Sequence, residues 1–234
     1  MAKNHIKRLA TPRSWLIARK DNVFVAKSDP GAHPMNMSLP LVVALRDVLS
    51  IVENAREVKS LINRELVYVN GKKVKSYRLP VGLFDCISFP TIDKYYRVIL
   101  NKKGRIDMIE IDKSEADKFI LQVIGKRLLK DRRVQLNLSS GMNIILPYEE
   151  HSNYSLYQSV LVSYPPLKII ESLPLKKKAK VFMLSGKHLG KIAEVQGMQA
   201  NGKEAVLEEG GTVFNAKVSS FIVVGEKEAA IKIA

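Results

Sequence analysis

The hydrophobic pattern of this 234-residue chain changes its period several times. Residues 41–52, LVVALRDVLSIV, are apolar nearly all round, which predicts a buried helix. In residues 55–66, AREVKSLINREL, a helix turning about 100° per residue would have one apolar and one polar side. The apolar side holds Val58, Leu61, Ile62 and Leu66, and the polar side holds Arg56, Lys59, Asn63 and Arg64. We therefore expect the second helix to bury one face and expose a basic one.

Short-range signals mark the start of this second helix and the turn beyond it. Asn54 stands three residues before Glu57, which is the spacing of a capping box. After the helix, residues 67–74 read VYVNGKKV, with Asn70-Gly71 between two β-type runs. An Asn-Gly pair in that position is the strongest short-range signal for a type I′ hairpin. The pattern predicts two helices followed by a hairpin.

The predicted hairpin has a definite register and a positive charge. A two-residue turn at Asn70-Gly71 pairs Tyr68 with Lys73 across the ladder. The second strand continues the basic side of the helix through Lys72, Lys73 and Lys75. The helix and the hairpin are thus expected to form one basic surface.

The region from residue 91 to residue 175 is predicted to be an α+β domain in which strands predominate. YRVIL and IDMIEI bracket NKKGR, which indicates a hairpin, and RRVQLNLSSGMNIIL alternates before a Ser-Gly turn. Two further short strands are expected at SVLVSY and LKII. One helix is expected here, because four apolar residues share one helical stripe: Phe119, Ile120, Val123 and Ile124. It is expected to end near Lys126.

Beyond the boundary run KKKAK, the chain changes to short strands at even spacing. The turns between them contain Gly186, Gly190, Asn201-Gly202 and Gly210-Gly211. Five short strands within about 50 residues predict a small β-barrel over residues 176–234. The expected strands are 180–184, 191–196, 204–209, 212–218 and 220–224.

The first 40 residues are charged but have no sustained apolar period. Residues 1–20 contain six basic side chains, and no acid precedes Asp21. The following KSDPGAHPMNMSLP is rich in proline and indicates an irregular loop. We expect an extended basic arm over residues 1–40 that becomes ordered only on RNA. Trp15, the only tryptophan, requires a packing partner, either protein or a nucleic-acid base.

The charge balance points to a polyanionic partner. Lysine and arginine total 38 against 23 acidic residues, so the formal charge is 38 − 23 = +15. Nucleic acid is the commonest partner of so basic a chain, and a membrane surface is the rival. No segment approaches the roughly 20 apolar residues that span a bilayer. The single Cys86 excludes an internal disulfide, and the four histidines lack metal-ligand spacing. A cytoplasmic setting, no metal and no cofactor are expected.

Two segments resemble known RNA-binding modules. REVKSLINRELVYVNGKKV with the later PVGLFDCISF is similar to the small RNA-binding domain named after bacterial small-subunit ribosomal protein four. That resemblance implies that the helix face and hairpin of residues 41–90 grip a helical junction of RNA. VFMLSGKHLGKIAEV resembles the KOW motif, which implies an SH3-like barrel of five strands. Its loop residues Lys187, His188 and Lys191 would then face RNA or another protein.

The order of segments resembles the archaeal and eukaryotic small-subunit ribosomal protein four-e family. The resemblance rests on HIKRLATPRSW, GAHPMNMSLPL, LPVGLFDCISF, GRIDMIEIDKSEADKF, FMLSGKHLGKIAEV and SSFIVVG, and it covers nearly all of the chain. It implies an α+β multidomain fold: arm (1–40), RNA-binding module (41–90), central domain (91–175) and KOW barrel (176–234). It also implies a structural, non-enzymatic component of the small ribosomal subunit. The missing basic C-terminal extension favours the archaeal branch.

Two alternatives remain open from the residues themselves. RNA pseudouridine synthases can contain the same module and a Gly-Arg-Leu-Asp motif with a catalytic aspartate, and this chain has Gly104-Arg105-Ile106-Asp107. The synthase motif does not continue as Met108-Ile109-Glu110, however. A concave basic pocket around Asp107 would favour the enzyme, and a convex turn would not. A KOW-bearing transcription or translation factor is the other alternative.

The expected partners are small-subunit rRNA and neighbouring ribosomal proteins, with neither a membrane nor a small-molecule substrate. Because basic side chains neutralise phosphates, the contacts are expected on three linked surfaces. The candidate RNA-binding residues are Lys3, His5, Lys7, Arg8, Arg13, Trp15, Arg19, Lys20, Arg56, Lys59, Asn63, Arg64, Lys72, Lys73, Lys75, Lys187, His188 and Lys191.

Overall fold

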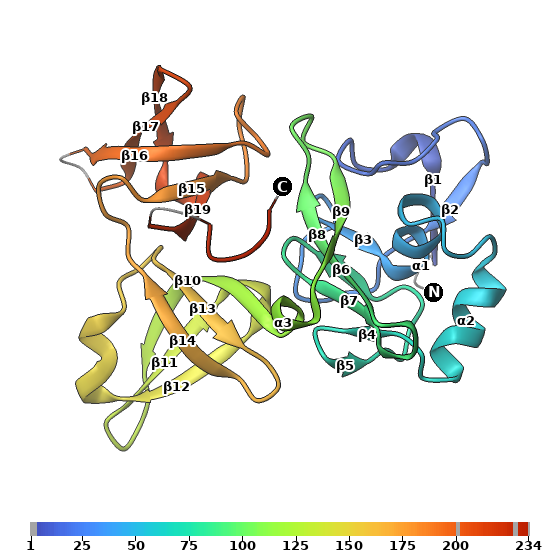
Figure 1. The fold of residues 1–234 in the computed structure, drawn as a ribbon, viewed down its shortest axis with the longest axis horizontal. Coiled ribbons are helices and arrows are strands. Elements are labelled where there is room, and N and C mark those ends of the chain that lie inside the picture. Colours follow the sequence, from blue (N-terminus) through green and yellow to red (C-terminus); the bar gives the residue numbers. More distant parts are fainter. Residues whose placement is uncertain (1–3, 200–201, 227–228, 234) are drawn as a thin grey trace. The chain divides into compact units, whose positions relative to one another are not determined.

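The computed structural model describes residues 4–199, 202–226 and 229–233. It is rich in antiparallel strands and contains few helices (Figure 1). The chain forms two compact units, residues 1–117 and residues 118–234. In the described part, no helix is long and apolar enough to cross a membrane.

The main sheet of the first unit has five antiparallel strands in the order β5-β4-β7-β8-β9. It contains the two predicted hairpins, and Tyr68 pairs with Lys73 as expected. Because β7 pairs with β8, the boundary predicted at residue 90 falls between two neighbouring strands of one sheet. The strands are β4 (Tyr68–Val69), β5 (Lys72–Lys73), β7 (Cys86–Phe89), β8 (Lys94–Leu100) and β9 (Ile106–Ile111).

The helices precede this sheet in the chain. The first helical segment combines α1 (Leu41–Val43) with a π-helical stretch (Ala44–Val48), so it is shorter than the predicted residues 41–52. It ends where Ser50 adopts a left-handed φ of 52°, which a continuing helix does not permit. The amphipathic helix is α2 (Ala55–Asn63).

Arg97 in β8 is a charged residue inside the first unit, and its side chain is fully buried. Its guanidinium donates to the Glu115 carboxylate at 2.9 Å and to the Glu115 carbonyl at 2.8 Å. Burial lowers the pKa of Arg97, and the hydrogen bond that its guanidinium donates to the Glu115 carboxylate opposes that shift. Glu115 lies on the short helix α3 (Lys113–Ala116), so this pair ties α3 to the sheet.

Residues 4–40 are folded within the first unit, which differs from the extended arm that the sequence predicts. Strand β1 (His5–Lys7) pairs with β2 (Phe24–Ala26), and β3 (Ser38–Pro40) pairs with β6 (Pro80–Gly82). Trp15 is 2% exposed and forms a β-bridge with Ile106 of β9. The cause is apolar packing: Trp15 finds its partner in the protein.

The first sheet of the second unit has the order β12-β11-β10-β13-β14. The helix predicted around residues 119–126 is wrong, because β10 runs as a strand from Lys118 to Leu128. Residues 119–123 are all buried, so both faces of this central strand are covered and its apolar run does not alternate. The neighbours are β11 (Arg133–Leu138), β12 (Asn143–Pro147), β13 (Ser159–Ser163) and β14 (Lys168–Leu173).

The second sheet of this unit has the order β18-β17-β16-β15-β19. Strands occur at all five positions predicted for the C-terminal region; of the expected turn at Asn201-Gly202, Asn201 lies outside the described residues. Gln122 of β10 donates a buried hydrogen bond to the Phe221 carbonyl of β19 at 3.1 Å, which links the two sheets. The strands are β15 (Lys180–Met183), β16 (Ile192–Met198), β17 (Glu204–Glu209), β18 (Thr212–Lys217) and β19 (Phe221–Gly225).

Candidate nucleic-acid interface

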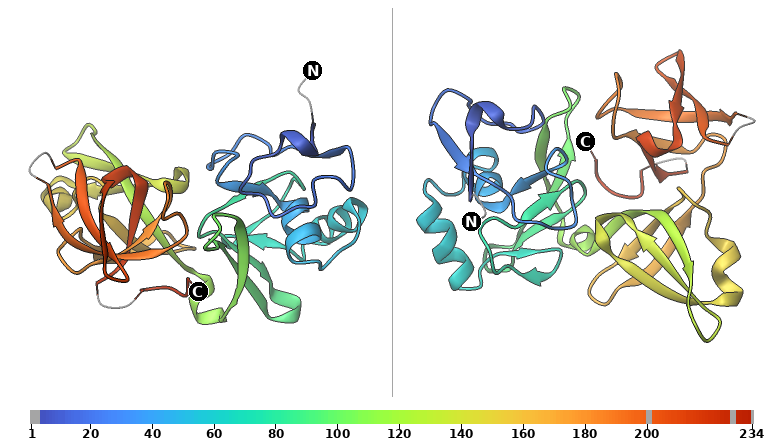
Figure 2. Two further views of the ribbon diagram at one scale, coloured as in Figure 1. Left: turned by 90° about the horizontal axis from the view of Figure 1, so that it is seen from above. Right: turned by 180° about the vertical axis from the view of Figure 1, so that it is seen from behind.

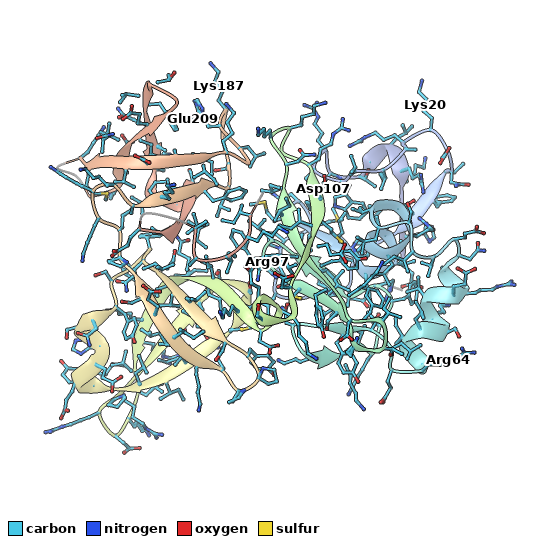
Figure 3. All side chains as sticks on the ribbon, viewed as in Figure 1. Lys20, Arg64, Arg97, Asp107, Lys187 and Glu209 are labelled. Carbon is cyan, nitrogen blue, oxygen red and sulfur yellow. The ribbon has the colours of Figure 1, made fainter. Side chains whose placement is uncertain are left out.

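Helix α2 separates an apolar face from a basic one. Val58 and Ile62 are buried, and Leu61 and Leu66 are half-buried. Burying this stripe turns the other face to solvent. The exposed side chains are Arg56, Lys59, Asn63 and Arg64, and Arg64 projects from the end of the helix in Figure 3.

The helix start differs from the predicted capping box in one detail. Asn54 is the N-cap residue, but its side chain makes no capping hydrogen bond. The Glu57 carboxylate instead accepts the backbone N–H of Glu53 at 2.9 Å. This places a negative charge at the positive end of the helix dipole, where it is stabilising. Glu57 therefore has a local structural role at the start of the helix.

The hairpin after α2 is the predicted type I′ turn, since Asn70 and Gly71 have φ values of 50° and 68°. The side chains of Lys72, Lys73 and Lys75 are exposed. Lys73 forms an ion pair with Glu65, and the hydrogen bond to Glu65 raises the pKa of Lys73. The positive charge of Lys73 is therefore partly compensated within the protein.

An aromatic residue beyond the hairpin contacts the basic face of α2. The ammonium group of Lys59 lies 4.8 Å from the centroid of the Tyr77 ring, in cation–π geometry. This contact restrains a long side chain that would otherwise move freely in solvent. Lys59 is thus held in place on the side of the helix that faces away from the core.

The structure corrects two RNA-binding predictions in the N-terminal segment. Arg8 is only 3% exposed, and its guanidinium donates to the Ala18 carbonyl at 2.5 Å and contacts Asp47 at 3.5 Å. Trp15 is buried, and its indole N–H donates to the Met35 carbonyl at 3.1 Å. Both side chains are used inside the protein, so neither is available to a nucleic acid.

The other predicted residues of this segment remain accessible. His5 packs its ring edge-to-face against Phe24, with 4.8 Å between centroids. Arg19 donates to the carbonyls of Leu9 and Pro12 at 3.3 and 3.0 Å. Lys3 lies outside the described residues. The exposed side chains are His5, Lys7, Arg13 and Lys20, and Arg19 is half-buried.

A basic hollow of about 520 Å³ lies beside Trp15. The hairpin loop between β8 and β9 contributes Lys103 and Arg105, which the sequence did not indicate as RNA-binding residues. The two basic residues belong to the NKKGR turn, which is visible in the sequence. The sequence does not show, however, that the Trp15–Ile106 bridge holds this turn beside the N-terminal segment. The complete lining is Arg13, Trp15, Ile17, Arg19, Lys103 and Arg105.

In the C-terminal sheet, the predicted basic loop is partly neutralised by one acid. The Glu209 carboxylate contacts Lys191 at 2.7 Å and His188 at 2.6 Å. The Lys191 hydrogen bond, aided by His188, lowers the pKa of Glu209 despite some burial. The His188 ring also stacks on Phe214, with 3.9 Å between centroids. Lys187 is exposed at the tip of the loop (Figure 3).

Comparisons with known proteins identify the family. The model of the ribosomal family S4e matches residues 92–169, and the RS4NT (NUC023) domain matches residues 2–36. Small ribosomal subunit protein eS4 of Nanoarchaeum equitans is 36% identical over 195 residues, covering 83% of this chain and 82% of its own. The chain belongs to the ribosomal family S4e. The eS4 protein of Methanocaldococcus jannaschii is 34% identical over 240 residues, covering 99% and 98% of the two chains.

The S4e fold is also present in a solved structure. The crystal structure of the 30S ribosomal protein S4e from Thermoplasma acidophilum superposes with a TM-score of 0.69 at 23% identity. The match covers 81% of this chain and 96% of that one. It shows that the two chains share a β-rich fold.

Asp107, the residue of the pseudouridine synthase alternative, lies within β9 of this S4e family member (Figure 3). Its carboxylate accepts the backbone N–H of Met108 at 2.9 Å, and the residue pairs with Ile99 across the sheet. Asp107 does not line the basic hollow, although the nearby Arg105 does. Among residues 4–199, 202–226 and 229–233, no three His, Cys, Asp or Glu side chains could hold a metal ion.

Proposed function

We propose that this S4e family member is a structural constituent of the small ribosomal subunit and binds its rRNA without catalysis. The supporting observation is the exposed basic face of α2, opposite the buried Val58 and Ile62, with the lysines of the β4–β5 hairpin beyond it. Relatives named small ribosomal subunit protein eS4 match nearly the whole chain. The site of action is then the ribosome, in the cytoplasm, among neighbouring ribosomal proteins.

In this proposal the segments have separate roles. Residues 41–90 form the RNA-binding module, residues 91–175 form the central domain, and residues 176–234 form an SH3-like KOW barrel. The antiparallel order β18-β17-β16-β15-β19 and the glycine-containing loop at Lys187 are compatible with such a barrel. Lys187 adds an exposed cation on the second unit, whereas the Glu209 carboxylate offsets the positive charge of Lys191 and occupies the His188 ring nitrogen.

Affinity in this mechanism comes mainly from phosphate neutralisation and counterion release, and specificity from the shape of a folded RNA junction. Side chains read A-form grooves poorly, so a rigid protein surface of matching shape is more useful than base-specific contacts. The type I′ turn and the Lys59–Tyr77 contact both limit the freedom of the basic groups. Because several weak RNA-binding surfaces belong to one chain, binding of one surface raises the effective concentration of the others near the RNA.

The test measures binding to a small-subunit rRNA transcript of Methanocaldococcus jannaschii over a range of salt concentrations. Replacing Arg56, Lys59, Arg64 and Lys72 by Gln should flatten the slope of log affinity against log salt by about 3, since each lost phosphate contact contributes roughly 0.7 to 0.9. Folding should persist because the apolar stripe is unchanged.

The matched control removes two arginines and two lysines from exposed positions of the second unit: Arg127, Lys130, Arg132 and Lys168. This control should keep the wild-type slope. If the salt slope flattens equally in both variants, the change reflects the total charge of the protein, and the α2 face is not the specific RNA-binding surface. Failure of the wild-type protein to bind the transcript, or to sediment with small subunits, would refute the proposed function.

A further inference from the structure

The basic hollow beside Trp15 is assembled from two segments that lie far apart in the sequence. The backbone N–H of Ile106 donates to the Ser14 carbonyl at 2.7 Å, and Trp15 bridges to Ile106 directly. The hydroxyl of Ser14 donates to the Asn36 carbonyl at 2.6 Å. These contacts fix residues 12–19 beside the β8–β9 hairpin, so the arginines of one segment lie next to the cations of the other.

The loop that supplies the other cations is also held in one shape. The Asn101 side-chain oxygen accepts the backbone N–H groups of Lys103 and Arg105 at 2.9 and 3.2 Å. The Asn101 N–H donates to the Arg105 carbonyl at 2.8 Å, and Gly104 has the positive φ of 69° that this turn requires. A loop restrained in this way presents its side chains at a lower entropic cost on binding.

The charge of the hollow has no counterpart within the described structure. Its lining contains four basic residues and no acidic one. Arg13, Lys103 and Arg105 are exposed, and among the described residues none of their side chains has an ion pair or hydrogen bond. This contrasts with Lys73, Arg97 and Lys191, each of which contacts a carboxylate. Three unpaired cations around one hollow repel one another, so a bound anion stabilises them.

The chemistry of the lining indicates which anion fits. Arginine guanidinium groups bind phosphate oxygens in a bidentate manner, and lysine binds them as a point charge. The volume of about 520 Å³ exceeds what a single ion needs and lies within the range of sites for larger groups. Ile17 adds an apolar contact suited to a sugar, while Trp15 lines the hollow but is too deeply buried to offer a ring face for stacking.

We propose that this hollow binds consecutive phosphates of an RNA strand, as a second grip separate from the α2 face. The inference rests on the proposed function and adds Lys103 and Arg105 to the RNA-binding residues. Arg13 and Arg105 bind phosphate oxygens, and Lys103 neutralises a neighbouring phosphate. The carbonyl contacts of Arg19 hold its guanidinium at the edge of the site.

The test compares two double variants of the full chain. Lys103→Gln with Arg105→Gln removes one lysine and one arginine from the β8–β9 loop. Arg127→Gln with Lys130→Gln removes the same charges from the β10–β11 hairpin, where both residues are exposed. Binding to the rRNA transcript should show a salt slope flatter by about 1.4 for the first variant, from two contacts of roughly 0.7 each, and unchanged for the second. Trp15 fluorescence reports whether the first unit is still folded.

A second measurement identifies the ligand class. Acetylation of Lys103 and dicarbonyl modification of Arg105 are followed by mass spectrometry with the transcript, with inorganic phosphate or with polyglutamate. Protection by RNA alone supports the proposal. Equal protection by inorganic phosphate, or stronger protection by polyglutamate, overturns it in favour of a small-anion or acidic-protein site. If wild-type protein binds the transcript and the Lys103/Arg105 variant keeps the full slope, this inference fails while the proposed function stands.

Discussion

At the scale of single residues, Asp85 shows how three segments of the first unit are joined. Its buried carboxylate accepts hydrogen bonds from the Asn70 side chain at 2.8 Å and from the Gly82 backbone at 2.7 Å, and it contacts His33 Nε2 at 3.0 Å. Gly82 has to be glycine, because a Cβ there would lie 2.2 Å from the His33 ring. Asn70 thus has a second role besides its turn conformation, which the Asn-Gly signal does not reveal.

The His33–Asp85 contact predicts a dependence of stability on pH. Burial by itself lowers the pKa of His33, but the hydrogen bond and the charge of Asp85 outweigh it and raise the pKa above 6.5. A raised pKa in the folded state means that the contribution is fully present below pH 6.5 and is lost as the pH rises through the folded value. The urea midpoint of the first unit, followed by Trp15 fluorescence, should therefore fall as the pH rises from about 6 to 8.

Two variants separate this effect from other titrations. His33→Gln should abolish the fall of the midpoint in this pH range, because glutamine does not titrate. His5→Gln removes an exposed histidine and should keep it. An unchanged pH profile in His33→Gln would show that the His33–Asp85 pair does not contribute to stability in this range.

At the scale of elements, the N-terminal segment shows how apolar packing and strand pairing can order a basic stretch. Six positive charges without an apolar period predict disorder. Trp15, however, is buried, and the pairing of β1 with β2 satisfies backbone groups that a free arm would leave to solvent. Packing of Trp15, together with the buried Val25 and Leu39 and the strand pairing, contributes to ordering the segment, so its basic groups can be positioned before RNA binds.

Amide exchange on the RNA-free protein tests this docking. The N–H of Arg8 donates to the Val23 carbonyl at 2.9 Å, and the N–H of Ile106 donates to the Ser14 carbonyl. Both amides should exchange at least 100-fold more slowly than exposed ones, if local opening costs about 3 kcal/mol or more. The exposed Lys102 provides an internal reference for fast exchange. Fast exchange at both positions would mean that the segment is free before RNA binds.

At the scale of the whole molecule, the chain divides after Asp117 into two compact units, which are the blue-to-green and the yellow-to-red parts of the ribbon in Figure 2. Each has its own buried core, and the buried charge of Arg97 is paired within the first unit with Glu115. The α2 face and the basic hollow both belong to the first unit, whereas Lys187 belongs to the second. Folding and the two main proposed grips can therefore be tested on a part of the chain.

We expect residues 1–117 and 118–234 to fold when produced separately, because few domains need partners once they bury their own core. Each fragment should give a dispersed amide spectrum and a cooperative urea transition. The first fragment should also keep most of the salt slope of the full chain on the rRNA transcript. A fragment that lacks a cooperative transition would show that the division after Asp117 is not a folding boundary.

The sequence alone determined the features that depend on neighbouring residues. The α2 stripe, the Asn70-Gly71 turn, the β8–β9 hairpin and the five C-terminal strands follow from local periodicity and turn chemistry. The family also follows from contiguous motifs, and the comparisons confirm it.

Only the tertiary structure decided the features that depend on distant residues. Strand β10 has a helix-like apolar run because both of its faces are covered, and no local pattern records what covers it. Trp15 and Arg8 became core residues because Ile106 and Asp47 lie beside them in space. The basic hollow exists for the same reason, since a bridge between residues 15 and 106 joins charges that the chain keeps far apart.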